Sequence, residues 1–455
     1  MSKKNILIAG AGPVGSLLGI YLARAGHQVK IFERRPDMRR HEIPAGRSIN
    51  LACSDRGFRA MADAGIADQV REVAIPMYGR VMHSVAGELT MQPYGKSDQA
   101  IYAISRSGIN EELINGADAF DNVSLSFDER CVHVDLDKPS ATFKNLHTGA
   151  ETTIEADVLI GADGAFSAVR SKMMLRDRFN YSQHYLPHGY KELFIPGNPD
   201  GSYKIEKEAL HIWPRGDQML IALPNLDGSF TCTLFMPFKG KEASFEALDS
   251  QEAARAFFQE VYPDALDLMP TFDDDFANNP TSSLVTIRCS PWVHEDKVAL
   301  IGDASHAIVP FYGQGMNSGL EDCRIFAESL AEGGDDWHQI LQIYQINRIE
   351  NANAIAELAL RNFIEMRDSV GNPAFLQKKQ LEKKLASMFP ERFVPTYSMV
   401  TFSHTPYAEA LRLGDEQEVM LKQMMEKPGL FDDLDTPQTE AYLSETFATW
   451  EQRNR

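Results

Sequence analysis

Residues 5–33 of this 455-residue chain, NILIAGAGPVGSLLGIYLARAGHQVKIFE, decide how its first half is organised. Asn5 to Gly10 is apolar without alternation, which predicts a strand buried on both faces of a parallel sheet. Val14 to Ala25 predicts a helix that ends at Gly26, and Gln28 to Glu33 predicts a second strand. The stretch therefore predicts a strand–helix–strand unit, which is the start of an α/β fold with a parallel sheet.

A dinucleotide-binding fingerprint, Gly10-Ala11-Gly12-Pro13-Val14-Gly15, lies between the first strand and the helix. Gly10 allows a tight turn, Gly12 lets the backbone approach a diphosphate, and Gly15 lets the helix pack on the strand. The phosphates would meet the free N–H groups at the helix N-terminus, around Pro13 and Val14. Glu33 ends the second strand and is placed to accept hydrogen bonds from a ribose. The fingerprint alone does not distinguish FAD from NAD.

Two later glycine-containing segments each follow a predicted buried strand, Ile154 to Ala162 or Lys297 to Asp303. The first segment contains Asp163-Gly164, and the second contains Gly302-Asp303. Asp303, at the end of its strand, is placed to bind a polyol such as the ribityl chain of a flavin. The run Gly313-Gln314-Gly315-Met316-Asn317 then opens a helix, whose N-terminus would stabilise negative charge on the pyrimidine edge of a reduced flavin.

Together these three segments closely resemble the single-component FAD aromatic hydroxylases, the p-hydroxybenzoate hydroxylase-like flavoproteins. The resemblance implies that the Asp163 segment serves both FAD and NADPH and that the Asp303 segment holds the ribityl chain. It also implies that Arg106 and Cys131 contact the cofactor, as do Gly315, Met316 and Asn317. The implied reaction uses NADPH to reduce FAD and a flavin C4a-hydroperoxide, formed with O2, to insert one oxygen atom into an aromatic ring.

Further strings are similar to one branch of that family, which hydroxylates the aniline ring of L-kynurenine in tryptophan degradation. These strings are Gly46–Ala52, Ile75–Met77, Pro187–Tyr190, His211–Arg215, Phe230–Pro237, Ile364–Arg367 and Tyr397–Ser403. The resemblance implies that Arg80 and Tyr94 bind the substrate carboxylate and that Asn362 and Tyr397 complete the pocket. A planar guanidinium grips a carboxylate with two hydrogen bonds, which agrees with this assignment. Tyr312 and His306 flank the run Gly313–Asn317, the flavin loop, and are weaker candidates for a hydrogen-bond donor to the hydroperoxide.

The sequence from Gly79 to Tyr94 predicts a hairpin with Gly87 near its tip. A two-residue turn at Ala86-Gly87 would put Arg80 and Tyr94 on opposite faces. A three-residue turn from Val85, with Gly87 left-handed, would make the two side chains diagonal neighbours on one face. We predict the three-residue turn.

The expected fold is α/β (α+β overall), with a Rossmann-like FAD-binding domain, an inserted antiparallel β-sheet substrate domain and a helical C-terminal region. Short β-rich runs between about Tyr185 and Cys289, with a hairpin turn signal at Asp227-Gly228, predict the sheet. The predicted boundaries are 1–75, 101–180 and 290–335 for the discontinuous FAD-binding domain, 76–100 and 181–289 for the sheet domain, and 336–455 for the helical region.

Composition limits the location and partners of the chain. A net charge of -19 disfavours nucleic acid, and it means that an anionic substrate needs a local cation. Five scattered cysteines without a CxxC pair suit a reducing compartment and predict neither a disulfide framework nor a zinc site. We see no signal peptide and no apolar stretch of roughly 18 residues. We therefore expect a cytoplasmic monomer or homodimer without a membrane anchor.

Three other functions remain open from the residues. A hydroxylase of a phenolic acid would share the fold and the cofactor. A flavin halogenase or an FAD reductase would share the nucleotide-binding half, although the halogenase string WxWxIP is absent. A flavin-binding redox module would share the fingerprint without catalysis.

Overall fold

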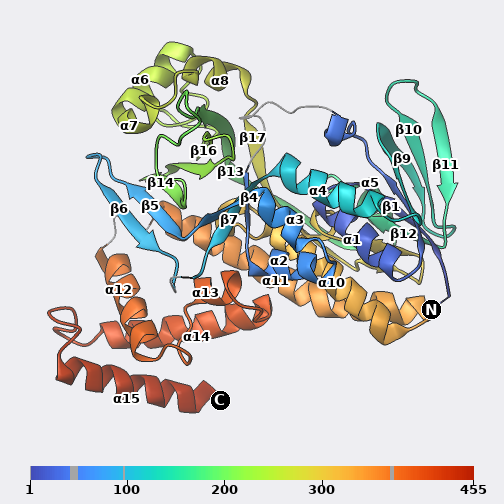
Figure 1. Ribbon diagram of the computed structural model, residues 1–455. Coiled ribbons are helices and arrows are strands. Elements are labelled where there is room, and N and C mark those ends of the chain that lie inside the picture. Colours follow the sequence, from blue (N-terminus) through green and yellow to red (C-terminus); the bar gives the residue numbers. More distant parts are fainter. Residues whose placement is uncertain (1, 41–49, 96–97, 369–372, 455) are drawn as a thin grey trace.

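The computed structural model describes residues 2–40, 50–95, 98–368 and 373–454, so part of the Gly46–Ala52 string lies outside the described residues. Its first layer is a six-stranded sheet in the order β18-β19-β12-β1-β2-β8 (Figure 1). The strands are β1 Asn5–Ala9, β2 Gln28–Phe32, β8 Val123–Ser126, β12 Val158–Gly161, β18 Val293–His294 and β19 Val298–Leu300. Helix α1, Pro13–Arg24, joins β1 to β2, which pair in parallel. The predicted strand–helix–strand start is confirmed.

The prediction of a single strand from Ile154 to Ala162 is wrong. The chain instead forms β11 (Glu151–Glu155) and β12, which belong to different sheets. Asp157 marks the break, because its carboxylate accepts a hydrogen bond from the backbone N–H of Asn5 at 2.7 Å, beside the start of β12. Strand β11 pairs with β10 (Ser140–Asn145), which pairs with β9 (Glu129–Asp135).

The second layer is a seven-stranded sheet in the order β17-β13-β16-β15-β14-β5-β6. Its strands are β5 Gly79–His83, β6 Leu89–Pro93, β13 Asn180–Ile195, β14 Ala209–Arg215, β15 Gln218–Pro224, β16 Phe230–Pro237 and β17 Ser282–Ser290. The predicted antiparallel pattern is confirmed except between β14 and β5, which run parallel. The predicted turn at Asp227-Gly228 is also confirmed, with Gly228 at φ 86°.

The two faces of this sheet carry different layers. One face packs against three helices that the β-rich pattern did not predict, namely α6 Gln251–Val261, α7 Pro263–Leu266 and α8 Phe272–Asn278. The other face supplies Ile212, Met219 and Phe235 to a core shared with helices from the C-terminal part of the chain. Figure 1 shows α6–α8 and α12–α15 on opposite sides of the strands. The second face is therefore the one that meets the rest of the molecule.

The remaining elements complete the nucleotide-binding half and the C-terminal region. They are β3 Asn50–Cys53, α2 Asp55–Asp63, α3 Ala67–Glu72, β4 Ala74–Met77, β7 Ile101–Ser105, α4 Arg106–Asp118, α5 Ala168–Met173, α9 Asp303–His306, α10 Gly315–Gly333, α11 Trp337–Asp368, α12 Pro373–Met388, α13 Thr396–Thr401, α14 Tyr407–Met425 and α15 Pro437–Asn454. Two short 3-10 helices, η1 Met38–Arg40 and η2 Pro310–Tyr312, stand among them.

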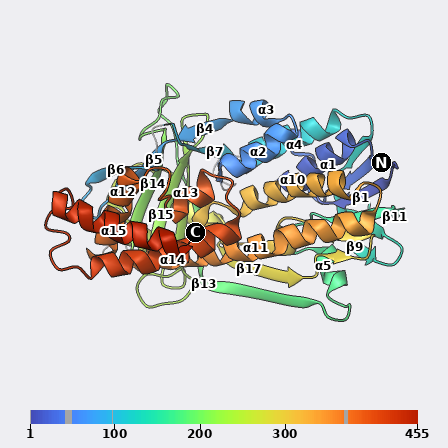
Figure 2. The same cartoon turned by 90° about the horizontal axis from the view of Figure 1, so that it is seen from below.

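The helical pattern predicted after Met316 is confirmed, and α10 and α11 pack side by side (Figure 2). In the described part of the chain, no helix combines the length and the apolar character needed to span a bilayer. The predicted fold class is confirmed, whereas the predicted domain boundaries stay a prediction.

Candidate active site

The fingerprint turn has the shape that a bound diphosphate requires. Gly10 has φ 106°, and a Cβ on Gly15 would lie 2.0 Å from the carbonyl oxygen of Gly10. A Cβ on Gly12, in contrast, would meet nothing within 4 Å. Gly12 is the N-cap of α1, which has no side-chain cap and no acidic residue in its first turn. The first backbone N–H groups of α1, such as that of Val14, therefore face open space that suits an anion.

The carboxylate of Glu33 ties the end of β2 to this turn. One of its oxygens accepts a hydrogen bond from the N–H of Ala11 at 2.9 Å, and the other accepts from Arg35 at 2.9 Å. Each carboxylate oxygen has a second lone pair, so these bonds leave acceptor capacity for a ribose. Glu33 therefore lies where the sequence predicted, beside the fingerprint.

Asp163 follows β12 and has one satisfied and one unsatisfied oxygen. Its Oδ2 accepts a hydrogen bond from the N–H of Ala168 at 2.6 Å, whereas its buried Oδ1 has no hydrogen-bond partner in the described structure. Burial raises the pKa of the Asp163 carboxyl. Cys131 is close by, since burial and then the charge of Asp163 raise the pKa of its thiol to about 12. An unsatisfied buried oxygen beside the fingerprint fits a ligand that brings its own donor.

Asp303 is the first residue of α9 and not the end of its predicted strand, because β19 ends at Leu300. Its side chain is exposed to solvent, yet the surrounding protein desolvates the carboxyl and raises its pKa, although His306 and Arg106 act in the opposite direction. Arg106, the first residue of α4, is exposed and close enough to Asp303 for their charges to interact. An exposed carboxylate enclosed by protein is the expected environment for a residue that binds a large cofactor.

The loop from Gly313 to Asn317 presents a second free helix N-terminus. Gly313 is left-handed at φ 67°, and Gln314, the N-cap of α10, makes no side-chain cap. The backbone N–H groups of Gly315, Met316 and Asn317 precede the first hydrogen bond of the helix, so they are available to a ligand. The side chain of Asn317 instead binds protein, because it accepts from Ser54 at 2.9 Å and donates to Ala52 and Gly313 at 2.8 Å. Its backbone, and not its amide group, is suited to contact a flavin.

The predicted three-residue hairpin turn is confirmed. Arg80 pairs with Gln92 across β5 and β6, which makes Tyr94 its diagonal neighbour on the same face. Gly87 closes the turn with φ 80°. The guanidinium carbon of Arg80 lies 5.3 Å from the ring centre of Tyr94. The hairpin therefore brings these two side chains together as predicted.

Tyr397 arrives at the same place from α13. The guanidinium carbon of Arg80 lies 4.6 Å from the centre of its ring, which also stacks on Tyr94 at 5.8 Å and on Tyr312 at 5.5 Å. The Nε of Arg80 and the hydroxyl of Tyr94 are buried without a hydrogen-bond partner in the described structure. Burial raises the pKa of Tyr94, so its hydroxyl remains a donor at neutral pH. These unsatisfied donors match a carboxylate.

Asn362 is held near this cluster by the flavin loop. Its amide donates to the carbonyl oxygen of Phe311 at 2.7 Å, and Phe311 packs on Phe363 of the same helix, α11. The rings of Phe311 and Phe235 are 5.0 Å apart. Asn362 therefore links α11 to η2, which carries Tyr312.

An apolar floor beside the cluster was not predicted residue by residue. The side chains that alternate on the inner face of the seven-stranded sheet form it, together with η2; they are Met82, Leu210, Ile212, Met219, Ile221, Phe235, Ile308 and Phe311. The alternation of β15 and β16 carried the signal, because every second residue of a strand shares a face. A flat aromatic ring would contact this floor while its carboxylate reached Arg80.

His306 is buried and bound to other side chains of the protein. It is 3% exposed, its Nε2 is 2.6 Å from Oδ2 of Asp322, and its ring stacks on Trp292 at 5.1 Å. Asp322 also accepts from the N–H of Gly302 at 3.0 Å. This arrangement favours a structural role for His306 in holding the loop before Asp303.

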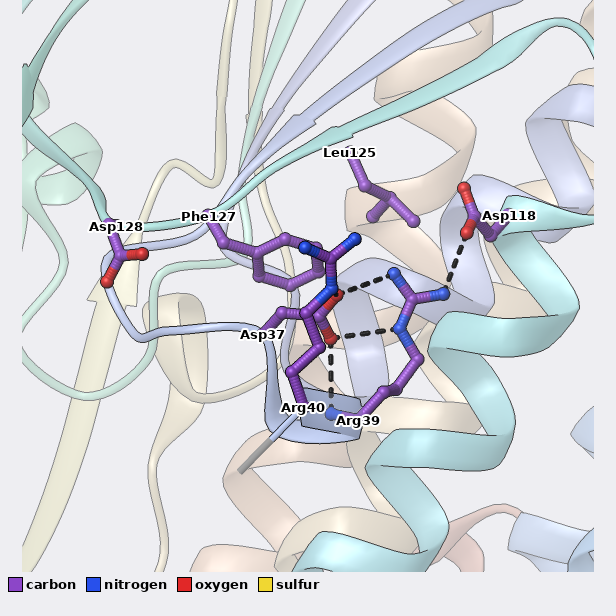
Figure 3. A pocket seen from close by; sticks show the side chains of 7 residues that line it. All are labelled: Asp37, Arg39, Arg40, Asp118, Leu125, Phe127 and Asp128. Atoms are coloured by element: carbon purple, nitrogen blue, oxygen red, sulfur yellow. Dashed lines mark hydrogen bonds and ion pairs between the residues drawn. The ribbon is translucent and has the colours of Figure 1, made fainter. Parts of the chain in front are cut away.

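A separate hollow of about 380 Å³ lies at the outer edge of β2 and β8 (Figure 3). Its residues are Asp37, Arg39, Arg40, Asp118, Leu125, Phe127 and Asp128. Arg39 is neutralised there by Asp37 at 2.9 Å and Asp118 at 2.7 Å. None of the predicted site residues lines this hollow, and its carboxylates outnumber its guanidinium groups.

Glu192 is an ionisable residue of the inner sheet face that sequence reasoning missed. It pairs with Thr233 across β13 and β16 and shares its face with Tyr190. Its Oε2 is buried without a hydrogen-bond partner in the described structure. Burial raises the pKa of Glu192 to about 7, even though Arg106 acts in the opposite direction. Glu192 therefore lies on the inner face of the sheet, close enough to Arg106 for their charges to interact.

A Glu192→Gln variant is expected to melt about 1–3 °C above the parent at about pH 8 and at the same temperature at about pH 4. The folded protein keeps the Glu192 proton up to about pH 7, whereas the unfolded chain releases it near 4.5. Parent stability thus falls as pH rises between these two values, and glutamine removes that loss. Melting temperatures of the two apoproteins across this pH range test the prediction. A difference in melting temperature that did not change with pH would contradict the raised pKa of Glu192.

Comparisons with known proteins show which family the chain resembles. The family model described as "FAD binding domain" matches residues 3–359. The kynurenine 3-monooxygenase of Flavobacterium psychrophilum is 49% identical over 93% of this chain and 94% of that protein. The kynurenine 3-monooxygenase of Dictyostelium discoideum is 44% identical over 93% of each chain.

Solved structures share the fold at lower identity. The tetrameric form of 2-methyl-3-hydroxypyridine-5-carboxylic acid oxygenase has a TM-score of 0.65 and 20% identity, covering 83% of this chain and 96% of that one. Pseudomonas aeruginosa PqsL, in complex with 2-aminobenzoylacetate, has a TM-score of 0.64 and 20% identity, covering 81% and 97%. At these identities the likeness shows the fold alone.

Proposed function

We propose, for a chain that belongs to the kynurenine 3-monooxygenase family of FAD-binding proteins, that Arg80, Tyr94 and Tyr397 bind the carboxylate of its substrate. The chain is a flavin-dependent aromatic monooxygenase with NADPH as electron donor and O2 as co-substrate. Its reaction is the hydroxylation of L-kynurenine to 3-hydroxy-L-kynurenine. The observation that carries the substrate assignment is a pair of unsatisfied buried donors, Arg80 Nε and the Tyr94 hydroxyl, beside an apolar floor.

The residues of the fingerprint, of the two later segments and of the α10 N-terminus fit FAD. Gly10, Gly12, Gly15 and Glu33 would hold the diphosphate and a ribose, Asp163 and Asp303 would accept hydrogen bonds, and the α10 N-terminus would meet the pyrimidine edge. Arg106, which is close enough to interact with the charge of Asp303, and Cys131, which is close to Asp163, are further contacts in this proposal. When bound, FAD supplies the redox chemistry that activates O2 for transfer of one oxygen atom to the ring.

The chain itself orients the ring and excludes water. Arg80 anchors one end of the substrate, so the aniline ring lies on the apolar floor at a fixed distance from the α10 N-terminus. Tyr397 and Tyr312 cover the anchor with stacked rings, and Asn362 fixes the loop that carries Tyr312. A dry chamber limits the wasteful release of hydrogen peroxide. Tyr312, with its pKa raised by burial, stays protonated and is the remaining candidate for a hydrogen-bond donor to the reacting oxygen.

Anaerobic stopped-flow reduction by NADPH, with and without L-kynurenine, tests cofactor, donor and substrate together. We expect flavin reduction to accelerate with L-kynurenine and not with salicylate, a phenolic acid. Product carrying one atom from labelled O2 would exclude a non-catalytic flavin module. Faster turnover of salicylate would replace this assignment with a phenolic acid hydroxylase.

The remaining assignments concern where the enzyme works. We propose a cytoplasmic enzyme, supported by five cysteines that are all free and four of them buried. We further propose a monomer or homodimer, which sedimentation of the holoenzyme would test.

A further inference from the structure

Arg56 is a buried cation that the reaction does not explain. It lies in the first turn of α2, and its side chain is fully buried. Its Nε donates to the carbonyl oxygen of Val400 at 2.8 Å, and one terminal nitrogen donates to Met399 at 3.3 Å and to Thr405. The guanidinium carbon also lies 4.0 Å from the centre of the Tyr407 ring. One side chain from the nucleotide-binding half therefore holds the segment between α13 and α14.

Two of the three carbonyl groups that Arg56 binds, those of Met399 and Val400, belong to the last turn of α13. These groups have no partner within the helix, and a cation there is also favoured by the helix dipole. Helix α13 is only six residues long, from Thr396 to Thr401, so it has little stability of its own. Tyr397 is on this helix. The position of the Tyr397 ring therefore depends on what fixes the other end of α13.

The guanidinium of Arg56 also binds α10, the helix that begins within the flavin loop. The second terminal nitrogen of Arg56 donates to Glu321 of α10 at 2.9 Å, and Glu321 also pairs with Arg348 of α11 at 2.7 Å. The hydroxyl of Tyr407 donates to Gln314, the N-cap of α10, at 2.9 Å. Arg56 thus fixes α13 against a rigid element and not against another loop.

We propose that Arg56 is a positioning residue for the substrate, holding Tyr397 against Arg80 and Tyr94 by capping the C-terminal end of α13. This inference rests on the proposed function, because it assigns Arg56 an effect on L-kynurenine through Tyr397. A buried ion pair that only stabilises the fold would be expected to change melting temperature and FAD content without acting through Tyr397.

The test compares substrate binding in four holoenzymes, the parent, Arg56→Lys, Glu321→Gln and Arg59→Met. Each is prepared twice, once with Tyr397 and once with Tyr397→Phe. Lysine keeps the charge beside Glu321 but cannot donate to three carbonyl groups in the planar geometry of arginine. Glu321→Gln weakens the ion pair and leaves the carbonyl contacts. Arg59, exposed on the same helix, is the matched control. Calorimetric titration with L-kynurenine, without NADPH, gives Kd, and steady-state assays give KM and kcat.

Arg56→Lys is expected to raise Kd and KM about tenfold, with kcat within about threefold, and to raise Kd less than twofold once Tyr397 is already phenylalanine. Arg59→Met is expected to keep Kd within about twofold of the parent, and Glu321→Gln, which weakens the anchor of Arg56 on α10, is expected to raise Kd by less than Arg56→Lys does. An equal rise of Kd in both Tyr397 backgrounds, or no rise, would overturn the role of Arg56 while leaving the proposed function intact. A parent holoenzyme that fails to bind L-kynurenine would overturn both.

Discussion

Arg80→Met is expected to lower kcat/KM for L-kynurenine by a factor of about 100 to 1,000, since removing one partner of a buried charge pair costs roughly 2–5 kcal/mol. No carboxylate of the described residues forms an ion pair with Arg80, so the substrate would be its natural counter-ion. The apoprotein is expected to melt no lower than the parent, because methionine removes a buried cation without stranding an acid. Steady-state kinetics and thermal unfolding of the same preparations check both expectations.

Tyr94→Phe removes a neutral donor from the same site and is compared with Arg80→Met. The hydroxyl of Tyr94 has no hydrogen-bond partner in the described structure, so its loss leaves nothing unpaired in the free enzyme. Only the bound carboxylate would lose a donor, which predicts a rise in KM of about tenfold with unchanged melting temperature. If Arg80→Met kept the parent KM, the carboxylate would have to bind elsewhere in the chamber.

Gly12→Ala is expected to weaken FAD binding about 100-fold, corresponding to roughly 2.7 kcal/mol, without destabilising the apoprotein. The φ of Gly12 is -69°, which alanine adopts freely, and the new methyl group would meet no atom of the chain within 4 Å. It would occupy the space through which the backbone approaches the diphosphate. Quenching of FAD fluorescence on binding to apoprotein gives Kd, and circular dichroism gives the melting temperature.

Gly15→Ala separates cofactor contact from protein packing. Its methyl carbon would lie 2.0 Å from the Gly10 carbonyl oxygen, so the turn must shift before any ligand binds. We therefore expect a lower melting temperature of the apoprotein in addition to weak FAD binding. Equal FAD affinity in Gly12→Ala and the parent would show that the diphosphate does not lie over this turn.

Local chemistry explains which parts of the fold were predictable. The turn from Val85 to Gly87 follows from the preference of glycine for positive φ, so its register could be deduced from a short stretch of sequence. Strands β11 and β12 were predicted as one strand because hydropathy does not show that Asp157 binds Asn5 of β1. Strand β1 shares a sheet with β12 and not with β11. Helices α6–α8 were missed because the β-rich runs around them dominated the pattern.

The candidate site was predictable where motifs are contiguous and less so where tertiary packing decides. Glu33 directly follows β2, whereas Asp303 begins α9 after β19 has ended at Leu300, and both placements follow from the strand–turn–helix pattern. The contact of Tyr397 with Arg80 depends on α13 docking, for which no local signal exists. Glu192 resembles an ordinary surface residue in the sequence, and only the sheet face on which it lies buries its carboxyl.

The docking of α13 also orders events during synthesis of the protein. A ribosome completes the hairpin with Arg80 early, whereas Tyr397 and the Thr405 carbonyl group that Arg56 binds emerge more than 300 residues later, a delay of roughly 15–60 s at usual elongation rates. During that interval the inner face of the seven-stranded sheet lacks Met399, Val400 and Tyr407. The apolar inner face of the sheet would therefore stay exposed in the nascent chain. A polypeptide truncated before α13 would lack Tyr397, so it would be a target for chaperones and would not bind substrate.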